Sequence, residues 1–377
     1  MFNDLRIHLA IIMYLLGCVS IMVYNAMVII RKNNSSKAMV RNTDRWAKEI
    51  KIQLEQDEYE LNPKHEKNLR RYLRNVEQLI AYSNALGRIK NEDYAAALDR
   101  YMVKLVENDV FVYLTADYRD RRTQERAYLA FFISQYPQVA KNSDGISSGT
   151  VDNMVSYIED SDIYCRVNVL KALSHVGDMY GVANVLQFFS ERRYFIHHKL
   201  LADELLCFVG NKEDLAKRLW SNHRIWNPNI MLGVVNFITM CSGAFDEEFL
   251  PVLKNPSANV EIRLAIMRYY RKNIYSQVHP ILLEYLSQTE NYDFAIVAAF
   301  VLDAYPSPVT TAALKAALES DKWHVRYNAI TSLVNLGEYS EDMVNELIEH
   351  DNDALQILQY KLEHAGGKEI RVGGAAK

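Results

Sequence analysis

A few side chains in this chain have types and spacings that could do chemistry. Two carboxylates two residues apart, as in Asp160-Ser-Asp162, can hold a metal ion and a sugar nucleotide when they stand at the end of a strand. No stretch nearby alternates as a strand does, so we interpret this motif as a helix cap and turn. Asp351-Asn-Asp353 begins like a calcium loop, but it lacks the glycine and the distal glutamate.

Neither the histidines nor any known catalytic motif indicates a metal site or an active site. His197 and His198 form the one histidine pair, and adjacent positions on a helix point about 100° apart, which is unsuited to holding one ion. The sequence contains no HExxH, GxxxxGK[ST], CxxC or GxGxxG motif. We therefore predict no catalytic residue, no metal site and no cofactor, and expect that the protein is not an enzyme.

The four cysteines suggest a reducing compartment. Cys18 lies in an apolar run, and Cys165, Cys207 and Cys241 fall in stretches that we expect to be buried helix faces. An odd set of three without a CxxC pair is typical of reduced core thiols.

An uncharged run of 22 residues, Leu9 to Ile30, predicts a transmembrane helix. At helical rise it spans about 33 Å, which matches a hydrocarbon core of about 30 Å. A cleaved signal peptide does not fit, because the run is too long and lacks a cleavage site. Leu15-Leu16-Gly17-Cys18 looks like a lipobox, but the chain after Cys18 stays apolar where a mature lipoprotein is polar.

Charges on either side of the run predict its orientation. Arg6 alone precedes it, whereas basic residues follow it at Arg31, Lys32, Lys37, Arg41, Arg45 and Lys48. The positive-inside rule therefore predicts a single-pass protein of the cell membrane, with the N-terminus outside and the rest in the cytoplasm. Arg31, Lys32, Lys37 and Arg41 are candidates to bind anionic lipid headgroups. Within the run, Gly17, Ser20 and Asn25 are candidates to pack against a partner's transmembrane helix.

The two regions that follow the apolar run are predicted to be mainly helical. Residues 31–90 are basic, with 14 Lys and Arg against 8 Asp and Glu, and we expect helices over 40–60 and from Asn62-Pro63 to about Leu86. Residues 91–149 read as a helix to about Leu114, a second helix that ends at Pro137, and a loop. Residues 31–149 are either a separate domain or degenerate repeats.

From residue 150 to 364 the chain falls into paired apolar helices. Polar turns recur about every 30 residues, which is a repeat period. The turns begin at Asp160, Ser190, Ser221, Asn255, Thr289, Ser320 and Asp351. The last unit, 340–364, is polar, as a capping repeat is, and 365–377 reads as a flexible tail. The predicted fold class is all-α, with one transmembrane helix followed by an α-solenoid.

This pattern resembles HEAT repeats in their short bacterial, phycobilisome-lyase-like form. The residues that carry the resemblance are a turn aspartate and an arginine that opens the second helix, seen in Ser161–Leu173 and Ser320–Leu333 with Arg166 and Arg326. Asn259–Ala265 supplies Arg263 in the same position. The units near 190–245 and 290–305 lack this arginine. The resemblance is specific for architecture and says little about function.

One basic and aromatic cluster in the repeats is a candidate partner-binding patch, and its members are Arg263, Arg268, Tyr269, Arg271 and Lys272. Residues 91–377 hold 28 Lys and Arg against 38 Asp and Glu, so we expect no nucleic-acid partner.

We expect a non-catalytic, membrane-anchored scaffold that binds a partner protein, itself a membrane protein. The resemblance to anchored bacterial HEAT proteins implies a subunit of a cell-envelope assembly for polysaccharide synthesis or export. Two alternatives stay open: a sensor of a small molecule or nucleotide in a groove, and a lyase-like or nucleic-acid-modifying HEAT enzyme.

Overall fold

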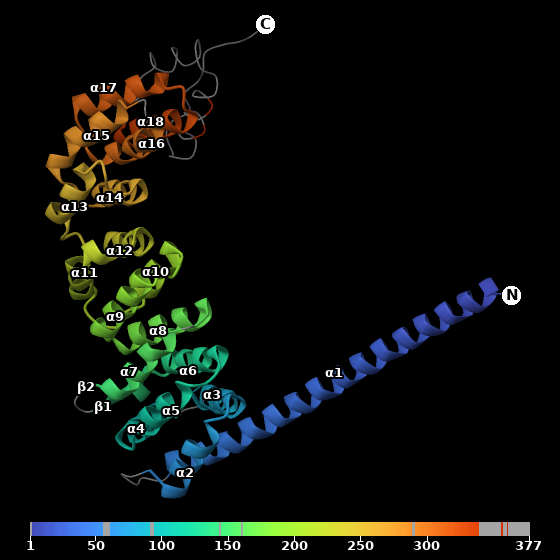
Figure 1. Ribbon diagram of the computed structural model, residues 1–377. Coiled ribbons are helices and arrows are strands. Elements are labelled where there is room, and N and C mark those ends of the chain that lie inside the picture. The colour runs from blue at the N-terminus through green and yellow to red at the C-terminus, as the bar shows by residue number, and fades with distance from the viewer. Residues whose placement is uncertain are drawn as a thin grey trace. The chain divides into compact units, whose positions relative to one another are not determined.

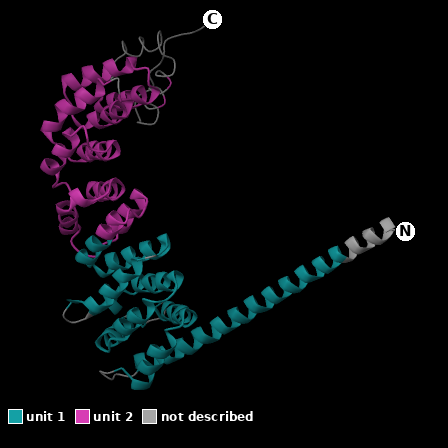
Figure 2. Cartoon of the chain, in the orientation of Figure 1, with its two compact units in different colours: residues 1–185 teal, residues 186–377 magenta. Residues whose placement is uncertain are grey.

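A computed structural model describes residues 2–55, 61–90, 94–142, 145–159, 161–288 and 291–338, together with Gln356 and Tyr360. Over these residues the fold is all-α, apart from one pair of two-residue strands (Figure 1). The chain divides into two compact units, Met1–Val185 and Leu186–Lys377 (Figure 2). The predicted fold class is confirmed. The expected capping repeat at 340–364, apart from Gln356 and Tyr360, and the tail at 365–377 lie outside the described residues.

Unit 1 begins with the longest helix of the chain. Its elements are α1 (Phe2–Glu55), α2 (Pro63–Tyr72), α3 (Val76–Lys90), α4 (Ala95–Glu107), α5 (Val110–Tyr118), α6 (Thr123–Gln135), β1 (Lys141–Asn142), β2 (Gly145–Ile146), α7 (Ser148–Val155) and α8 (Ile163–Val176). The helix α9 (Met179–Glu191) crosses the division between the units.

The helices of unit 2 are all much shorter than α1 and are similar to one another in length. They are α10 (His198–Leu206), α11 (Lys212–Ser221), α12 (Pro228–Cys241), α13 (Asp246–Lys254), α14 (Val260–Lys272), α15 (His279–Leu286), α16 (Tyr292–Val301), α17 (Pro308–Ala316) and α18 (Trp323–Leu336).

The expected transmembrane helix and the expected charged helix after it are one helix, α1. The connecting stretch, residues 31–39, contains no glycine or proline, so nothing in it ends a helix. From Met13 to Ile30 almost all side chains are exposed, and α1 is long and apolar enough to cross a membrane. Further along, Thr43, Trp46 and Ile50 are buried against the rest of unit 1.

Each unit stacks its helices in two rows. In unit 1 the C-terminal part of α1 contacts α3, α3 contacts α6, and α6 contacts α8, while α2, α5 and α7 form the other row. In unit 2 the row α10, α12, α14, α16 and α18 lies against α11, α13, α15 and α17. No single pair can bury its apolar face alone, so the core of each unit forms between its stacked helices, with buried residues from both rows. The C-terminal part of α1 is the first helix of its row.

Local signals explain where the helices begin and end. Asn62 caps α2 through its side chain and Pro63 occupies the first turn, as predicted. The helix expected from Pro63 to about Leu86 is interrupted, because the Asn75 side chain accepts hydrogen bonds from the backbone of Glu77 and Gln78 and so starts α3.

A second interruption separates α4 from α5. The sequence predicts one helix to about Leu114, but Asp109 adopts a left-handed backbone conformation with φ of 51°. The loop expected over 141–149 also contains β1, β2 and the start of α7.

An arginine at the fourth position of a helix occurs in α6, α8, α14 and α18, which lie in the rows that begin with α1 and α10. Arg166, Arg263 and Arg326 donate to the backbone carbonyls of Asp162, Leu253 and Ser320 at 3.3, 3.0 and 2.7 Å. The corresponding residue of α6, Arg126, donates to the carbonyl of Glu159 at 3.4 Å. The sequence analysis missed Arg126, which occupies the same helix position as the other three arginines.

Candidate functional site

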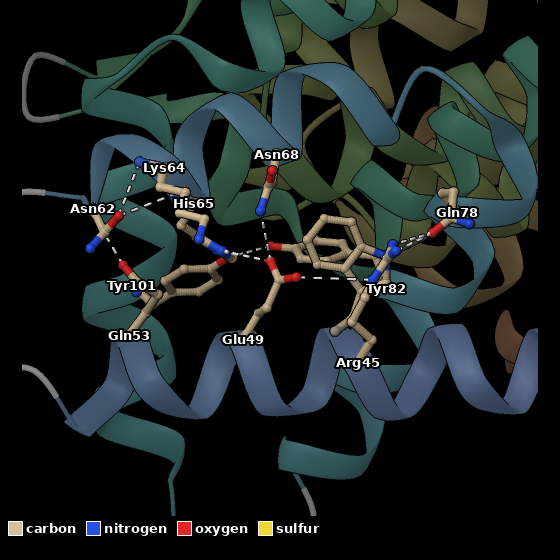
Figure 3. A network of polar contacts seen from close by, with 11 residues as sticks. Arg45, Glu49, Gln53, Asn62, Lys64, His65, Asn68, Gln78, Tyr82 and Tyr101 are labelled. Carbon is tan, nitrogen blue, oxygen red and sulfur yellow. Dashed lines mark hydrogen bonds and ion pairs between the residues drawn. The ribbon is translucent and has the colours of Figure 1, made fainter.

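The junction at which α1 joins the repeats is the best-built polar site in the described residues (Figure 3). Trp46 is fully buried there, and its ring lies edge-on to the ring of Tyr82 with centroids 5.4 Å apart. The indole N–H of Trp46 and the guanidinium of Arg45 both donate to the Gln78 side-chain oxygen, at 3.2 and 2.8 Å. These contacts join α1 to α3.

A chain of polar side chains crosses the same junction. Nδ1 of His65 lies 3.4 Å from Oε2 of Glu49, and Nε2 of His65 lies 2.8 Å from the Tyr101 hydroxyl. That hydroxyl is 2.9 Å from the Tyr82 hydroxyl. Asn68 also donates to Glu49, at 3.4 Å. Helices α1, α2, α3 and α4 each contribute to this network (Figure 3).

Burial sets the protonation states in the network. Desolvation lowers the pKa of His65, and the Glu49 carboxylate offsets part of that lowering. Desolvation also raises the pKa of the Tyr82 and Tyr101 hydroxyls. A neutral His65 with its proton on Nδ1 can donate to Glu49 and accept from Tyr101 through Nε2.

A carboxylate, an imidazole and a phenol in line are groups that acid–base catalysis uses. Here His65 is 4% exposed and Tyr101 is 1% exposed, so no substrate can reach them in this conformation. The arrangement instead joins the apolar helix to the first repeats, and an unpaired buried polar group in it would be costly.

The predicted membrane-surface residues lie on α1 before this junction. Arg31, Lys32, Lys37 and Arg41 are all exposed, between the apolar run and the first buried residue, Thr43.

The predicted transmembrane packing residues are free of contacts with the rest of the described chain. A Cβ built on Gly17 would meet no other atom within 4 Å, and Asn25 is exposed. The Ser20 hydroxyl donates to the carbonyl of Leu16 at 2.8 Å, which satisfies it within the helix.

The structure separates the members of the predicted partner-binding patch on α14. Arg263 is 9% exposed, with its guanidinium 4.4 Å from the ring centroid of Phe294 and 2.7 Å from the Tyr285 hydroxyl, to which it donates. Tyr269 is fully buried, and its hydroxyl accepts from the backbone of Phe245. Neither side chain belongs to an exposed surface.

The remaining members of that patch differ in exposure. Arg271 forms a two-pronged ion pair with Asp303, through Nε at 2.9 Å and Nη2 at 2.6 Å. Arg268 and Lys272 are exposed. The residues are neighbours in sequence, but the helix turns Arg263 and Tyr269 toward the core.

The motifs considered for metal chemistry have structural roles. Asp162 caps α8, because its side chain accepts from the backbone of Cys165 at 2.8 Å, while Asp160 lies outside the described residues. His197 caps α10, and its ring stacks on that of His198. In the described part of the chain, no three His, Cys, Asp or Glu side chains lie together as metal ligands would.

The expectation of three buried thiols is only partly right. Cys165 is buried, and desolvation raises its pKa to about 11. Cys241 is half-buried, but Cys207 is exposed just beyond the end of α10. The apolar residues around Cys207 suggested that it is buried, but its position at a helix end exposes it.

The C-terminal part of unit 2 is similar to a known repeat family. Residues 280–365 match the family of HEAT repeats. The match begins in α15 and includes α16, α17 and α18. Together with the all-helical fold, it supports the resemblance predicted from the arginine positions. No curated protein matches the chain.

Proposed function

We propose that this protein is a non-catalytic, membrane-anchored scaffold that binds a partner protein through its HEAT-type repeats. The observation that carries the proposal is the dual character of α1, which is apolar and exposed at one end and buried in the repeats at the other. A helix of this kind holds a large interaction surface close to a membrane. Helical repeats supply such surfaces.

Binding at a membrane favours a partner that is itself membrane-bound, since confinement to one surface raises its effective concentration. Gly17, Ser20 and Asn25 on α1 would contact its transmembrane helix, and Arg31, Lys32, Lys37 and Arg41 would contact anionic headgroups. By resemblance, the complex would belong to the cell envelope and act in polysaccharide synthesis or export.

Purification of the full-length chain from its host in mild detergent, with co-purifying proteins identified by mass spectrometry, tests the scaffold. A stoichiometric membrane protein would support it. Recovery of the chain alone from membranes that were never exposed to high salt would contradict it.

The exposed thiol of Cys207 offers a test of orientation. We propose that the repeats lie in the cytoplasm. A membrane-impermeant maleimide should then label Cys207 only after cell lysis, and a Cys207→Ser variant supplies the background. Equal labelling of intact and lysed cells would contradict the orientation.

The alternative of a small-molecule sensor has weaker support. A hollow of about 350 Å³ among α15–α18 has a suitable size, but its polar lining includes Glu319 and Asp321 and no basic side chain that would hold a nucleotide. The enzyme alternatives require a basic concave face or clustered carboxylates. The residues proposed for the former, on α14, are divided between core and surface.

A further inference from the structure

A continuous row of cations lies on the outer face of α2. This face lines an open trough of about 600 Å³, which we call the α2 trough, and its lining is Pro63, Glu66, Lys67, Arg70, Arg71 and Arg74. The spacing of these residues places them along one side of the helix, opposite the buried His65 and Leu69. Lys67, Arg70 and Arg71 thus stand along α2, and Arg74 lies two residues beyond its end, beside one carboxylate.

Part of this charge is unbalanced within the protein. Arg70 pairs with Glu66 at 2.9 Å, and Arg74 lies 3.5 Å from Asp117. Lys67 and Arg71 are exposed and form no ion pair with any residue that the structure describes. The trough therefore attracts an anionic occupant.

An apolar slot opens from the same cations. A cavity of about 80 Å³ between α2 and α5 is lined by Leu69, Arg70, Arg74, Val110, Tyr113 and Leu114. The Arg70 guanidinium lies 4.1 Å from the ring centroid of Tyr113, and it donates to the carbonyl of Asn108 at 2.7 Å. These contacts hold Arg70 in place between slot and trough, so an occupant of both would be acidic with one apolar side chain.

The position of α2 along α1 argues against lipid headgroups as the occupant. The helices run antiparallel, with Asn62 bonded to Gln53 and the ring of Tyr72 packed against that of Trp46. Arg45, which lies over the Tyr72 ring, follows the apolar run by 15 residues, or about 22 Å of helix. Headgroups extend about 5–8 Å beyond the hydrocarbon, and charge is screened within about 8 Å more.

We propose that the α2 trough and its slot bind an acidic α-helix of the partner protein. Carboxylates spaced three or four residues apart would face the cations of α2, and one leucine or phenylalanine would enter the slot at Tyr113. A trough this open suits a macromolecule, since small-molecule sites enclose their ligands. A nucleic acid is disfavoured by the acidic remainder of the chain. This inference rests on the proposed scaffold function and names the surface and partner chemistry.

A pair of helix-stapled, fluorescent peptides tests the site on the full-length protein in detergent. In one peptide, glutamates recur every three or four residues on one face around a single leucine. In the other, the same residues are spread around the helix. Fluorescence anisotropy should show at least about tenfold tighter binding of the first peptide, and about tenfold loss when its leucine becomes alanine.

Charge reversal at Lys67→Glu with Arg71→Glu should abolish this difference. The exposed pair Lys199→Glu with Lys315→Glu changes the net charge equally and should leave binding unchanged. Equal binding of both peptides, or full binding to the Lys67 and Arg71 variant, would overturn the proposal. So would displacement of the peptide when the protein is placed in nanodiscs that contain anionic lipid, because α2 would then face the bilayer.

Co-purification from the host separates this inference from the scaffold function. Loss of the partner in the Lys67 and Arg71 variant, with retention in the Lys199 and Lys315 variant, would support the site. A partner retained by both variants would refute the site and leave the scaffold function intact. A wild-type chain without any partner would refute the scaffold function.

Discussion

Nε2 of His65 is hydrogen-bonded to the hydroxyl of Tyr101 at 2.8 Å, and both side chains are almost completely buried. The pair joins α2 to α4 at the place where α1 enters the repeats. Its neighbours on either side, Glu49 and Tyr82, extend the contact into α1 and α3. One chain of polar contacts therefore links the four helices α1, α2, α3 and α4.

Tyr101→Phe should destabilise this junction by about 1–3 kcal/mol, because it leaves Nε2 of His65 and the Tyr82 hydroxyl without their buried partner. Hydrogen exchange of the full-length protein over residues 61–90 measures the local opening free energy. Tyr113→Phe is the matched control, since that hydroxyl belongs to a side chain that is 57% exposed. Equal exchange in both variants would show that the network contributes little.

The junction should weaken at mildly acidic pH. Burial lowers the pKa of His65, so the unfolded chain binds a proton near pH 6.5 while the folded chain does not. The free energy of unfolding should therefore fall as pH drops from about 6.5 to the lower folded-state pKa, by at most about 1.4 kcal/mol per pH unit. Thermal unfolding of wild type and His65→Gln at pH 7.5 and 5.5 checks this, and parallel losses in the two proteins would contradict it.

Trp46→Ala should release α1 from the repeats. Removing a fully buried indole costs about 3–5 kcal/mol, and here it also removes one of the two donors to the Gln78 side-chain oxygen. Faster hydrogen exchange should extend from residue 43 to Glu55 and into α3. Ile52→Ala, on the same helix but 42% exposed, should change exchange little.

Arg263→Ala should destabilise unit 2 by about 2–3 kcal/mol, because it removes charged hydrogen bonds to the Leu253 carbonyl and the Tyr285 hydroxyl. The exposed Arg268 on the same helix provides the control, and Arg268→Ala should stay within about 0.5 kcal/mol of wild type. Exchange rates over α14 and α15 distinguish the two. Similar losses in both variants would place Arg263 outside the core contacts.

Arg271→Lys should weaken the contact between α14 and the helical turn that follows α16, although the charge is kept. A lysine ammonium cannot reproduce the two parallel bonds that Arg271 makes with the Asp303 carboxylate, which is 7% exposed. We expect a loss of about 1 kcal/mol in local opening free energy. Lys272→Arg, next in sequence and exposed, should have no effect.

Sequence patterns predicted helix boundaries correctly where a local residue caps or ends a helix. The Asn62-Pro63 start, the Pro137 stop and the polar turns near Ser190, Ser221, Asn255 and Ser320 were correct because caps and turns depend on residues close in sequence. The breaks at Asn75 and Asp109 were missed, since both residues also occur inside helices and the apolar period continues across them.

The candidate sites were harder to predict because they depend on which helix faces meet. The basic cluster on α14 looked continuous in sequence, yet Arg263 and Tyr269 face the core. His65 and Tyr101 are 36 residues apart, and no local pattern signals their contact. Lys67 and Arg71 are four residues apart in sequence, but the slot beside them requires α5.

Because α1 is one unbroken helix, the direction in which each side of its apolar run faces is fixed relative to the repeats. Each residue added between Arg31 and Asn42 would turn the apolar run by about 100° relative to unit 1, so two added residues would present nearly the opposite side of Gly17 and Ser20 to a neighbouring helix. Seven added residues would restore the original angle to within about 20°. For a partner that contacts both ends of α1, the length of this segment therefore sets the angle between its two contact surfaces. Partner binding should tolerate insertions only at lengths that restore this angle.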